Sequence, residues 1–299
     1  MLGPVILGYI PSPSSGTIDA GPLTIHMYGL MLLAAIAACI VVTGIRWTRQ
    51  GGDWDLVFRV AVWGVAFGIV GARAYHVITS WDEVDHDHWW GVFAVWQGGL
   101  GVWGGILLGA LAGAVVVKLA GESVRHFMDA IAPGLLLAQG IGRWGNWWNQ
   151  ELYGKPTKQS WGLEIDIDHQ GAIAEKYRNA EAYHPTFLYE FIYDVAMAGV
   201  LIAIGWRFRI KPPALFALYV SFYTLGRFLE ELLRIDPSHH LFGLRLNAWV
   251  AAVLFVLSTL FFIWWQFIRR APEPGQRRPR KIELGPRMAV PKGRVRPSR

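Results

Sequence analysis

The chain has 299 residues, of which 53% are hydrophobic and 17% are charged. This composition excludes a disordered chain, and the single cysteine excludes a disulfide-stabilised scaffold. The formal charge is +6, but residues 269–299 alone carry eleven basic and two acidic side chains, so the preceding residues sum to −3. This distribution argues against nucleic-acid binding through the body of the chain. It favours contact between the basic tail and an anionic membrane surface.

Seven stretches of the chain are long, apolar and nearly free of charged residues. About 20 such residues are needed to cross a hydrocarbon layer of ~30 Å as a helix. We therefore predict an all-α integral membrane protein with about seven transmembrane helices, in a polytopic domain that covers residues 1–268. The predicted spans are residues 25–45, 56–78, 93–117, 127–145, 187–206, 214–233 and 248–267.

The loops between these spans alternate in charge. Basic residues follow the first, third and fifth spans, whereas the loop after the second span is acidic and the first 24 residues contain no Lys or Arg. Because basic loops stay on the cytoplasmic side, we predict that the N-terminus lies outside and the C-terminus in the cytoplasm. Residues 146–186 then form an extracytoplasmic head segment. Residues 269–299, rich in Pro, Arg and Gly, are predicted to be a disordered cytoplasmic tail.

Glycines recur every four residues in the third span and at Gly64 and Gly68 of the second. A stripe of small residues along one helix face lets a neighbouring backbone approach closely, so the pattern predicts tight helix packing. The alternative interpretation is that the missing side chains leave room for a lipid chain.

Three arginines, Arg73, Arg143 and Arg227, fall inside predicted spans. A charge at that depth costs at least ~2.5 kcal/mol, so it usually marks a site or a pathway. Arg227 shares one helix face with Glu231 and Arg234, and an Arg227–Glu231 pair would still leave a cationic surplus in the bundle. Guanidinium groups bind phosphate in a planar fork, so the surplus indicates a phosphate ligand. The alternative is that these arginines reach the membrane interface along their alkyl chains.

The densest group of polar residues lies at 140–154. This segment holds four glycines, one arginine, three carboxamides and one carboxylate at the outer end of the fourth span. Arg143 and Asn146 are three residues apart and share a helix face, and three tryptophans nearby suit the membrane interface. The segment therefore predicts a binding site for a polar headgroup at the depth of the membrane surface.

The run Gly142-Arg143-x-Gly-Asn146-x-x-Asn149-x-Glu151-x-x-Gly154 resembles the signature of phosphatidylglycerol:prolipoprotein diacylglyceryl transferases at every fixed position. Shorter motifs of that family follow in the same order along residues 26–234. They centre on His26 with Tyr28, on Arg73, on Asp129, on His184 with Glu190, and on Arg227 with Glu231 and Arg234.

The resemblance implies a reaction. The diacylglyceryl group of phosphatidylglycerol is transferred to the cysteine thiol of a prolipoprotein, which forms a thioether and releases glycerol phosphate. The implied partners are phosphatidylglycerol, prolipoprotein signal peptides with a lipobox, and membrane lipids. No metal and no other cofactor is implied. The implied location is the bacterial plasma membrane, as a multi-pass protein.

The resemblance also assigns roles to residues. Arg143 and Arg227 are expected to be catalytic, because they would stabilise the charge that develops on the phosphate leaving group. The residues expected to bind substrate are His26, Tyr28, Arg73, Asn146, Glu151, Gly154 and Glu231. Those expected to support the site are Asp129, Asn149, His184 and Arg234.

One position departs from the family pattern. Many members have a histidine, proposed as the base, where this chain has Trp103, and tryptophan cannot accept a proton. Either His26, His184 or Glu151 deprotonates the thiol, or the thiol ionises in a cationic site without an essential base.

Two other functions fit parts of the pattern. A transporter or binding protein for an anionic lipid or organic phosphate would also need arginines in the membrane, and an inverted repeat, which is not evident here, would favour it. A metal-dependent phosphotransferase would need clustered carboxylates for Mg²⁺. The spans hold only scattered ones, which disfavours it.

Overall fold

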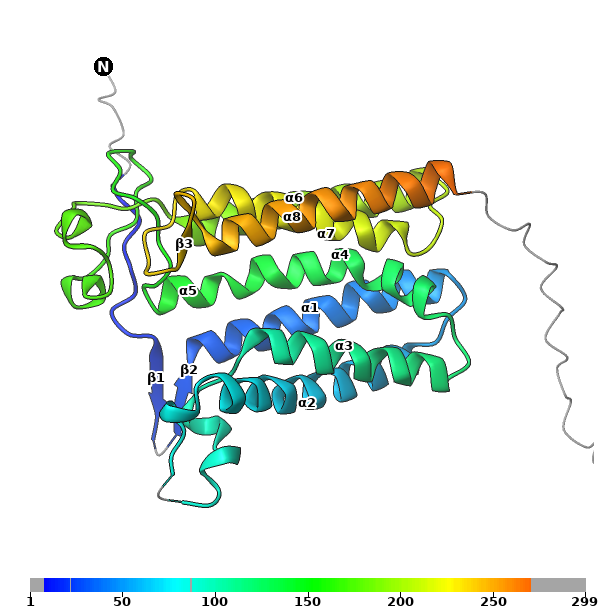
Figure 1. The fold of residues 1–299 in the computed structure, drawn as a ribbon, viewed down its shortest axis with the longest axis horizontal. Helices are drawn as coiled ribbons and strands as arrows, with labels where there is room; N and C mark the ends of the chain where they lie inside the picture. Colours follow the sequence, from blue (N-terminus) through cyan, green and yellow to red (C-terminus); the bar gives the residue numbers. More distant parts are fainter. Residues whose placement is uncertain (1–7, 22, 87, 270–299) are drawn as a thin grey trace, which may run out of the picture.

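The computed structural model describes residues 8–21, 23–86 and 88–269. Within these ranges the chain forms a bundle of long helices that run side by side (Figure 1). The helices are α1 (Met27–Arg49), α2 (Trp54–Thr79), α3 (Val102–Leu119), α4 (Val124–Gly142), the short α5 (Trp144–Trp148), α6 (Thr186–Arg207), α7 (Ala214–Glu231) and α8 (Leu246–Ile263), which continues as a π-helical turn at Trp264–Ile268.

Five of the helices are long and apolar enough to cross a membrane: α1, α2, α3, α6 and α8 with its π-helical turn. The other two long helices, α4 and α7, carry more polar residues. α4 packs against α1, α6 and α7, so its polar side chains have protein neighbours rather than lipid. The prediction of an α-helical membrane protein is therefore confirmed, and five spans are supported by length and composition.

The third predicted span begins too early. Residues 93–101 are not α-helical. Short 3₁₀ turns cover Gly91–Phe93 and Val95–Gln97, and α3 starts at Val102. Gly98 and Gly99 both adopt positive φ, of 88° and 68°, a backbone conformation that interrupts a helix. The run looks continuous in hydropathy because the residues around this pair are apolar.

Two short β-hairpins lie outside the bundle, so the all-α description omits a small part of the chain. β1 (Thr17–Ala20) pairs antiparallel with β2 (Leu23–His26), and β3 (His240–Leu241) pairs with β4 (Leu244–Arg245). Both hairpins lie at the same end of the bundle as α5 (Figure 1). Each leads directly into a long helix, α1 or α8, and so sets where that helix begins.

Glycines in the two stripes and directly beside them, at Gly71 and Gly104, pack α2 against α3. A Cβ atom added at Gly71 would lie 2.3 Å from the carbonyl oxygen of Gly104, and one added at Gly104 would lie 2.1 Å from that of Gly71. Gly64 and Gly109 make a similar approach further along, at 2.9 Å from the Gly109 Cβ position. These contacts support the packing interpretation of the stripes rather than room for a lipid chain.

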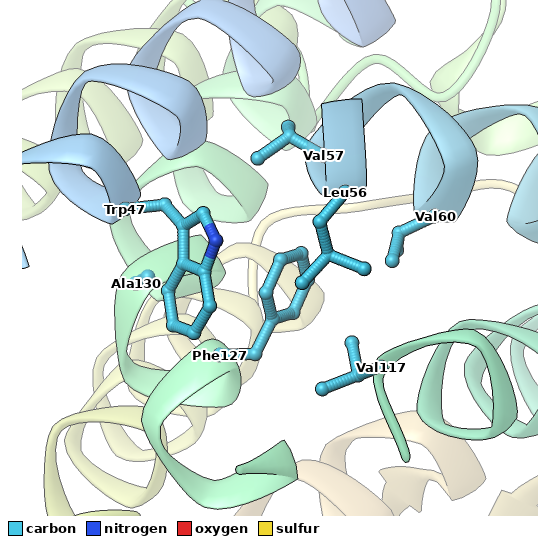
Figure 2. Packing of buried hydrophobic residues seen from close by; sticks show 7 residues of the cluster. All are labelled: Trp47, Leu56, Val57, Val60, Val117, Phe127 and Ala130. Atoms are coloured by element: carbon cyan, nitrogen blue, oxygen red, sulfur yellow. The ribbon is translucent and has the colours of Figure 1, made fainter. Parts of the chain in front are cut away.

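A hydrophobic cluster joins four helices at the end of the bundle opposite the hairpins. Trp47 of α1 meets Phe127 of α4 edge to face, with ring centroids 5.2 Å apart. Leu56, Val57 and Val60 of α2, Val117 of α3 and Ala130 of α4 complete the cluster (Figure 2). This packing holds the last turn of α1 in a defined position.

Residues 149–185 form a folded segment without long helices, at the hairpin end (Figure 1). Its own small core includes Leu163, Ile165 and Tyr183, and Phe187 of α6 joins that core to the bundle. Residues 9–13 pack onto it, since the Ile10 N–H donates to the Gly162 carbonyl at 2.7 Å and the Gln150 amide donates to the Pro13 carbonyl at 3.0 Å. The segment therefore covers one end of the bundle.

Candidate active site

A network of arginines and carboxylates lies beneath the folded segment of residues 149–185. It is found where α4 and α7 end and α6 begins. Arg143 follows the last residue of α4, Glu190 lies in the second turn of α6, and Arg227 lies in the last two turns of α7. The helices bring these residues together although up to 84 positions separate them in the sequence.

Arg143 is held from two sides. Its Nη2 lies 2.7 Å from Glu190 Oε1, and its Nη1 donates to Asn146 Oδ1 at 3.4 Å. Asn146 in turn donates to Glu151 Oε1 at 2.8 Å, and Asn149 donates to the same oxygen at 3.3 Å. Four residues of the predicted signature are thus joined into one hydrogen-bonded chain.

Arg227 is held by residues of its own helix and of α6. Its Nη1 lies 2.5 Å from Glu230 Oε2 and 3.9 Å from Glu190 Oε2, and its Nη2 donates to Glu231. Glu190 therefore lies between the two arginines predicted to be catalytic. The predicted pairing of Arg227 with Glu231 along one helix face is confirmed.

The far side of the network is closed by Arg245, at the start of α8. Its guanidinium donates to Glu231 Oε2 and, at 2.8 Å, to Asp236 Oδ2. Arg234 also binds Asp236, at 2.7 Å and 2.9 Å. Burial alone would raise the pKa of Asp236, but the hydrogen bonds and positive charges of Arg234 and Arg245 lower it below its usual range.

The expected cationic surplus is not found among the described residues. Four arginines meet four carboxylates: Arg143, Arg227, Arg234 and Arg245 with Glu190, Glu230, Glu231 and Asp236. The expectation was wrong because it counted only acids near each arginine in the sequence, whereas Glu190 comes from another helix. The arginines are therefore fixed in orientation before any ligand binds.

Exposure separates the members of this network. The side chains of Arg143 and Arg227 are 19% and 16% exposed, whereas Glu190 is 3% and Glu231 0% exposed. The three glutamates lie behind, and Arg143 and Arg227 each keep an accessible face. Asp236, on the far side with Arg234 and Arg245, is 20% exposed. An anion that approaches beside Arg143 and Arg227 meets their guanidinium groups before the glutamates.

The remaining residues of the predicted signature line or brace this site. Tyr28 packs on α5, since a Cβ added at Gly145 would lie 2.5 Å from its ring. Gly154 packs closely against His184 and Leu233, since an added Cβ would lie 2.9 Å from the His184 Cβ and 3.3 Å from the Leu233 carbonyl oxygen. The Gly154 N–H donates to the His184 carbonyl at 2.9 Å. Gly142, by contrast, has no described atom within 4 Å of its Cβ position, so open space adjoins Arg143 there.

His184 lies at the edge of the head segment, just before α6. Its Nδ1 is 3.0 Å from the Tyr189 hydroxyl, which also accepts a hydrogen bond from Trp161 at 2.9 Å. According to the tautomer of the neutral imidazole, His184 Nδ1 donates to this hydroxyl oxygen or accepts from it. Burial and the nearby charge of Lys155 lower the pKa of His184, so its imidazole is neutral at pH 7.

Two predicted residues have their partners elsewhere. Arg73 is buried and donates to the carbonyls of Gly91, Val92, Gly98 and Gly99, which holds the turns before α3 together. Asp129 lies toward the other end of α4, where its Oδ1 accepts from the Phe216 N–H at the start of α7. This fits a supporting residue that acts on helix packing.

His26 precedes α1 at the end of β2 and is exposed. Trp103, in the first turn of α3, is 57% exposed, and α3 packs mainly against α2. Among the described residues, no group of three or more His, Cys, Asp or Glu is arranged to hold a metal ion.

Sequence reasoning missed four members of the network: Glu190, Glu230, Asp236 and Arg245. Asp236 lies in the loop after α7, outside every predicted span, and gave no signal. Arg245 gave no signal because it lies in a short hairpin between two apolar runs. Glu190 belongs to the His184 motif, and Glu230 neighbours Glu231, but both were counted only as scattered carboxylates. A search for acids at the same predicted membrane depth as Arg143 would have found Glu190.

The long apolar helices define a polytopic membrane protein, and an arginine–carboxylate network lies at one end of its bundle, beneath a folded polar segment. The family model described as "Prolipoprotein diacylglyceryl transferase" matches residues 16–264. The chain belongs to this family of bacterial membrane enzymes and is a multi-pass protein of the cell membrane.

Individual relatives agree. The chain is 43% identical over 272 residues to the phosphatidylglycerol–prolipoprotein diacylglyceryl transferase of Frankia alni, covering 90% of this chain and 70% of that protein. It is 42% identical over 259 residues to that of Streptomyces griseus, covering 86% and 78%. It is 40% identical over 278 residues to that of Bifidobacterium adolescentis, covering 89% and 83%.

Proposed function

We propose that this chain transfers the diacylglyceryl group of phosphatidylglycerol to the lipobox cysteine of prolipoproteins, with Arg143 and Arg227 binding the phosphate that leaves. The observation that carries the residue assignment is the position of Glu190 between the two guanidinium groups, 2.7 Å from Arg143 and 3.9 Å from Arg227. It supports two arginines set to act on one anion.

We further propose that all seven long helices span the membrane, with the N-terminus outside and the C-terminus in the cytoplasm. The support is the charge of the two ends. The end opposite the hairpins carries basic residues in the terminal turns of α1, α2, α3, α4 and α6 and in the loop before α7: Arg46, Arg49, Arg59, Lys118, Arg125, Arg207, Arg209 and Lys211. Basic residues favour the cytoplasmic side, so the arginine–carboxylate network lies on the outer side.

In this topology residues 1–268 form the membrane domain and residues 146–186 its extracytoplasmic head segment. The head covers the network, which supports a role in admitting the precursor peptide. The proposed basic tail, residues 269–299, lies outside the described residues except for Arg269.

The phosphate of the lipid would bind at the exposed faces of Arg143 and Arg227. When the C–O bond to the glycerol phosphate breaks, negative charge grows on that phosphate oxygen, and two fixed guanidinium groups stabilise it. Asn146 and Glu151 keep Arg143 in place, and Glu231 keeps Arg227 in place. Fixed donors accelerate the step because they need no reorganisation as the charge develops.

The thiol proton needs an acceptor. Glu151 already accepts two amide hydrogen bonds through one oxygen. His184 is neutral, and when its Nδ1–H donates to the Tyr189 hydroxyl oxygen, its Nε2 is left to accept the thiol proton. A site whose charges balance also gives less help to a thiolate than a cationic one. We therefore assign the base to His184, before His26 and Glu151.

The test of the function is a mass shift. Purified full-length protein in detergent is given phosphatidylglycerol and a peptide that carries Leu-Ala-Gly-Cys. We expect the peptide to gain one diacylglyceryl group, and a peptide with serine in place of cysteine to gain none. A folded preparation that binds the lipid and leaves the cysteine peptide unmodified would contradict the proposal and favour a transporter or a binding protein.

A further inference from the structure

A second cluster of arginines lies at the opposite end of the bundle from the network. A hollow of about 520 Å³ opens there between the last turns of α1 and α6, lined by Arg46, Arg49, Gln50, Gly205 and Trp206. No carboxylate lines it. Neither arginine has a carboxylate within 4.0 Å in the part of the chain that the structure describes.

Arg46 is buried and held in place by α4. Its Nε donates to the Ala130 carbonyl at 3.1 Å and its Nη2 to the Asp129 carbonyl at 3.2 Å. Four residues after Asp129 stands Pro133, which has no N–H for that carbonyl, so Arg46 supplies the missing donor. These two hydrogen bonds use two of the five N–H groups of the Arg46 guanidinium and leave three that can donate to a ligand in the hollow.

Gly205 leaves room beside the N–H groups of Arg46 that have no partner in α4. A Cβ atom at position 205 would lie 3.2 Å from Nη2 and 3.4 Å from Nη1 of Arg46, so any side chain there would crowd the donors. Arg49 stands beside it, with its guanidinium 5.3 Å from the centre of the Trp206 ring. Trp206 is 66% exposed, and an exposed indole at a helix end suits the boundary between headgroups and acyl chains.

We propose that this hollow binds the phosphate of an anionic phospholipid from the leaflet at this end of the bundle, separately from the substrate site at the other end. Basic pockets between membrane helices bind such headgroups through charge-assisted hydrogen bonds. Arg46 and Arg49 hold the phosphate, and Trp206 flanks the start of the acyl chains. Arg46 already interacts electrostatically with Asp129 but forms no ion pair with it, and the lipid phosphate supplies an anion in direct contact.

The hollow is rigid enough to be selective. The cluster around Trp47 fixes the last turn of α1 from the other side (Figure 2).

Arg125 offers a matched comparison at the same end of the bundle. Its guanidinium also stacks on a tryptophan, 5.4 Å from the Trp265 ring, but it does not line the hollow.

The test is native mass spectrometry of the full-length protein in detergent, titrated with phosphatidic acid, with phosphatidylcholine of the same chains, and with inorganic phosphate. Phosphatidic acid is used because it carries the anionic phosphate without the glycerol headgroup of the substrate. We expect R49Q and G205A to bind phosphatidic acid about tenfold more weakly than the wild type, and R125Q to bind it as the wild type does. Melting temperatures confirm that each variant is folded.

Four results would overturn the proposal. One is unchanged binding in R49Q and G205A. Another is an equal loss in R125Q, which would mean that basic charge at this end acts without a site. The third is binding of phosphatidylcholine as tight as that of phosphatidic acid. Displacement of phosphatidic acid by millimolar inorganic phosphate would show a site for free phosphate and would overturn the lipid assignment.

Discussion

Arg143 and Glu190 form an ion pair of 2.7 Å between the end of α4 and the second turn of α6. Glu190 is buried, and Arg143 keeps part of its guanidinium exposed. The pair therefore presents a cation of fixed orientation to the space beside Gly142.

Arg143→Ala should abolish transfer, with a loss of at least about a hundredfold in kcat/KM, because one donor to the leaving phosphate is lost. Arg143→Lys should recover little, since an ammonium cannot bind Glu190 and a phosphate in one plane. The mass-shift assay measures both, and membrane insertion and melting temperature serve as controls. Turnover near the wild-type rate in folded Arg143→Ala would refute the phosphate assignment.

Arg245→Gln tests a positioning residue. Without Arg245, Glu231 loses one of its two closest cationic partners, and Arg227 loses its defined orientation. We expect kcat to fall about tenfold with a smaller change in KM, together with about 3 kcal/mol less stability, because a buried carboxylate is left partly unpaired. Arg245→Lys should restore stability more than activity. A variant that loses stability and keeps kcat would show that Arg245 acts on folding alone.

His184→Asn tests the base. The pKa of His184 is lowered by burial and by Lys155, so its neutral, proton-accepting form dominates at pH 7 and is lost as the pH falls through that lowered value. In the wild type, kcat/KM should therefore decline on the acid side. In His184→Asn that acid limb should disappear and the rate at pH 7 should fall about a hundredfold.

The control for His184 is Tyr189→Phe, which removes the hydroxyl 3.0 Å from Nδ1 but leaves the imidazole. It should keep an acid limb at a shifted pH. If the pH profile of His184→Asn matches that of the wild type, the proton goes to His26, to Glu151 or directly to water.

Trp103→His tests the departure from the family pattern. Trp103 is more than half exposed on α3, so its replacement should change the free energy of unfolding by no more than about 0.5 kcal/mol. Transfer should also remain near the wild-type rate, since α3 packs mainly against α2 and makes few contacts with α4. A large gain in rate would indicate that a base is missing at this position.

Gly104→Ala should destabilise the bundle. The added Cβ would lie 2.1 Å from the Gly71 carbonyl oxygen and 2.4 Å from the Tyr75 Cβ, so α2 and α3 must separate. We expect a loss of about 1–3 kcal/mol, seen as a lower melting temperature. Gly199→Ala is the matched control, because no described atom lies within 4 Å of its Cβ position, and it should leave stability unchanged or raise it slightly.

Much of the site could be predicted from local sequence. Arg143, Asn146, Asn149 and Glu151 lie within nine residues, and the structure joins them through hydrogen bonds. Their closeness in the sequence alone places them together at the outer end of the fourth predicted span. Arg227 and Glu231 were predictable for the same reason, because a helix brings residues four apart together.

The charge balance of the site was not predictable in this way. Glu190 and Arg245 reach the network from other helices, after loops whose course no local pattern specifies. Arg73 shows the same limit, since its partners are backbone carbonyls of a segment that hydropathy assigned to a helix.

Hydropathy and glycine spacing were enough to establish a helical membrane protein, the approximate limits of its long helices and the segment that carries the site, because each depends on residues close together in the chain. The pairing of Arg143 with Glu190, the closure of the network by Arg245 and the hollow beside Arg46 depend on which helix faces meet. Only the packing of the whole bundle decides that, since ion pairs and cavities form between side chains that are neighbours in space and distant in sequence.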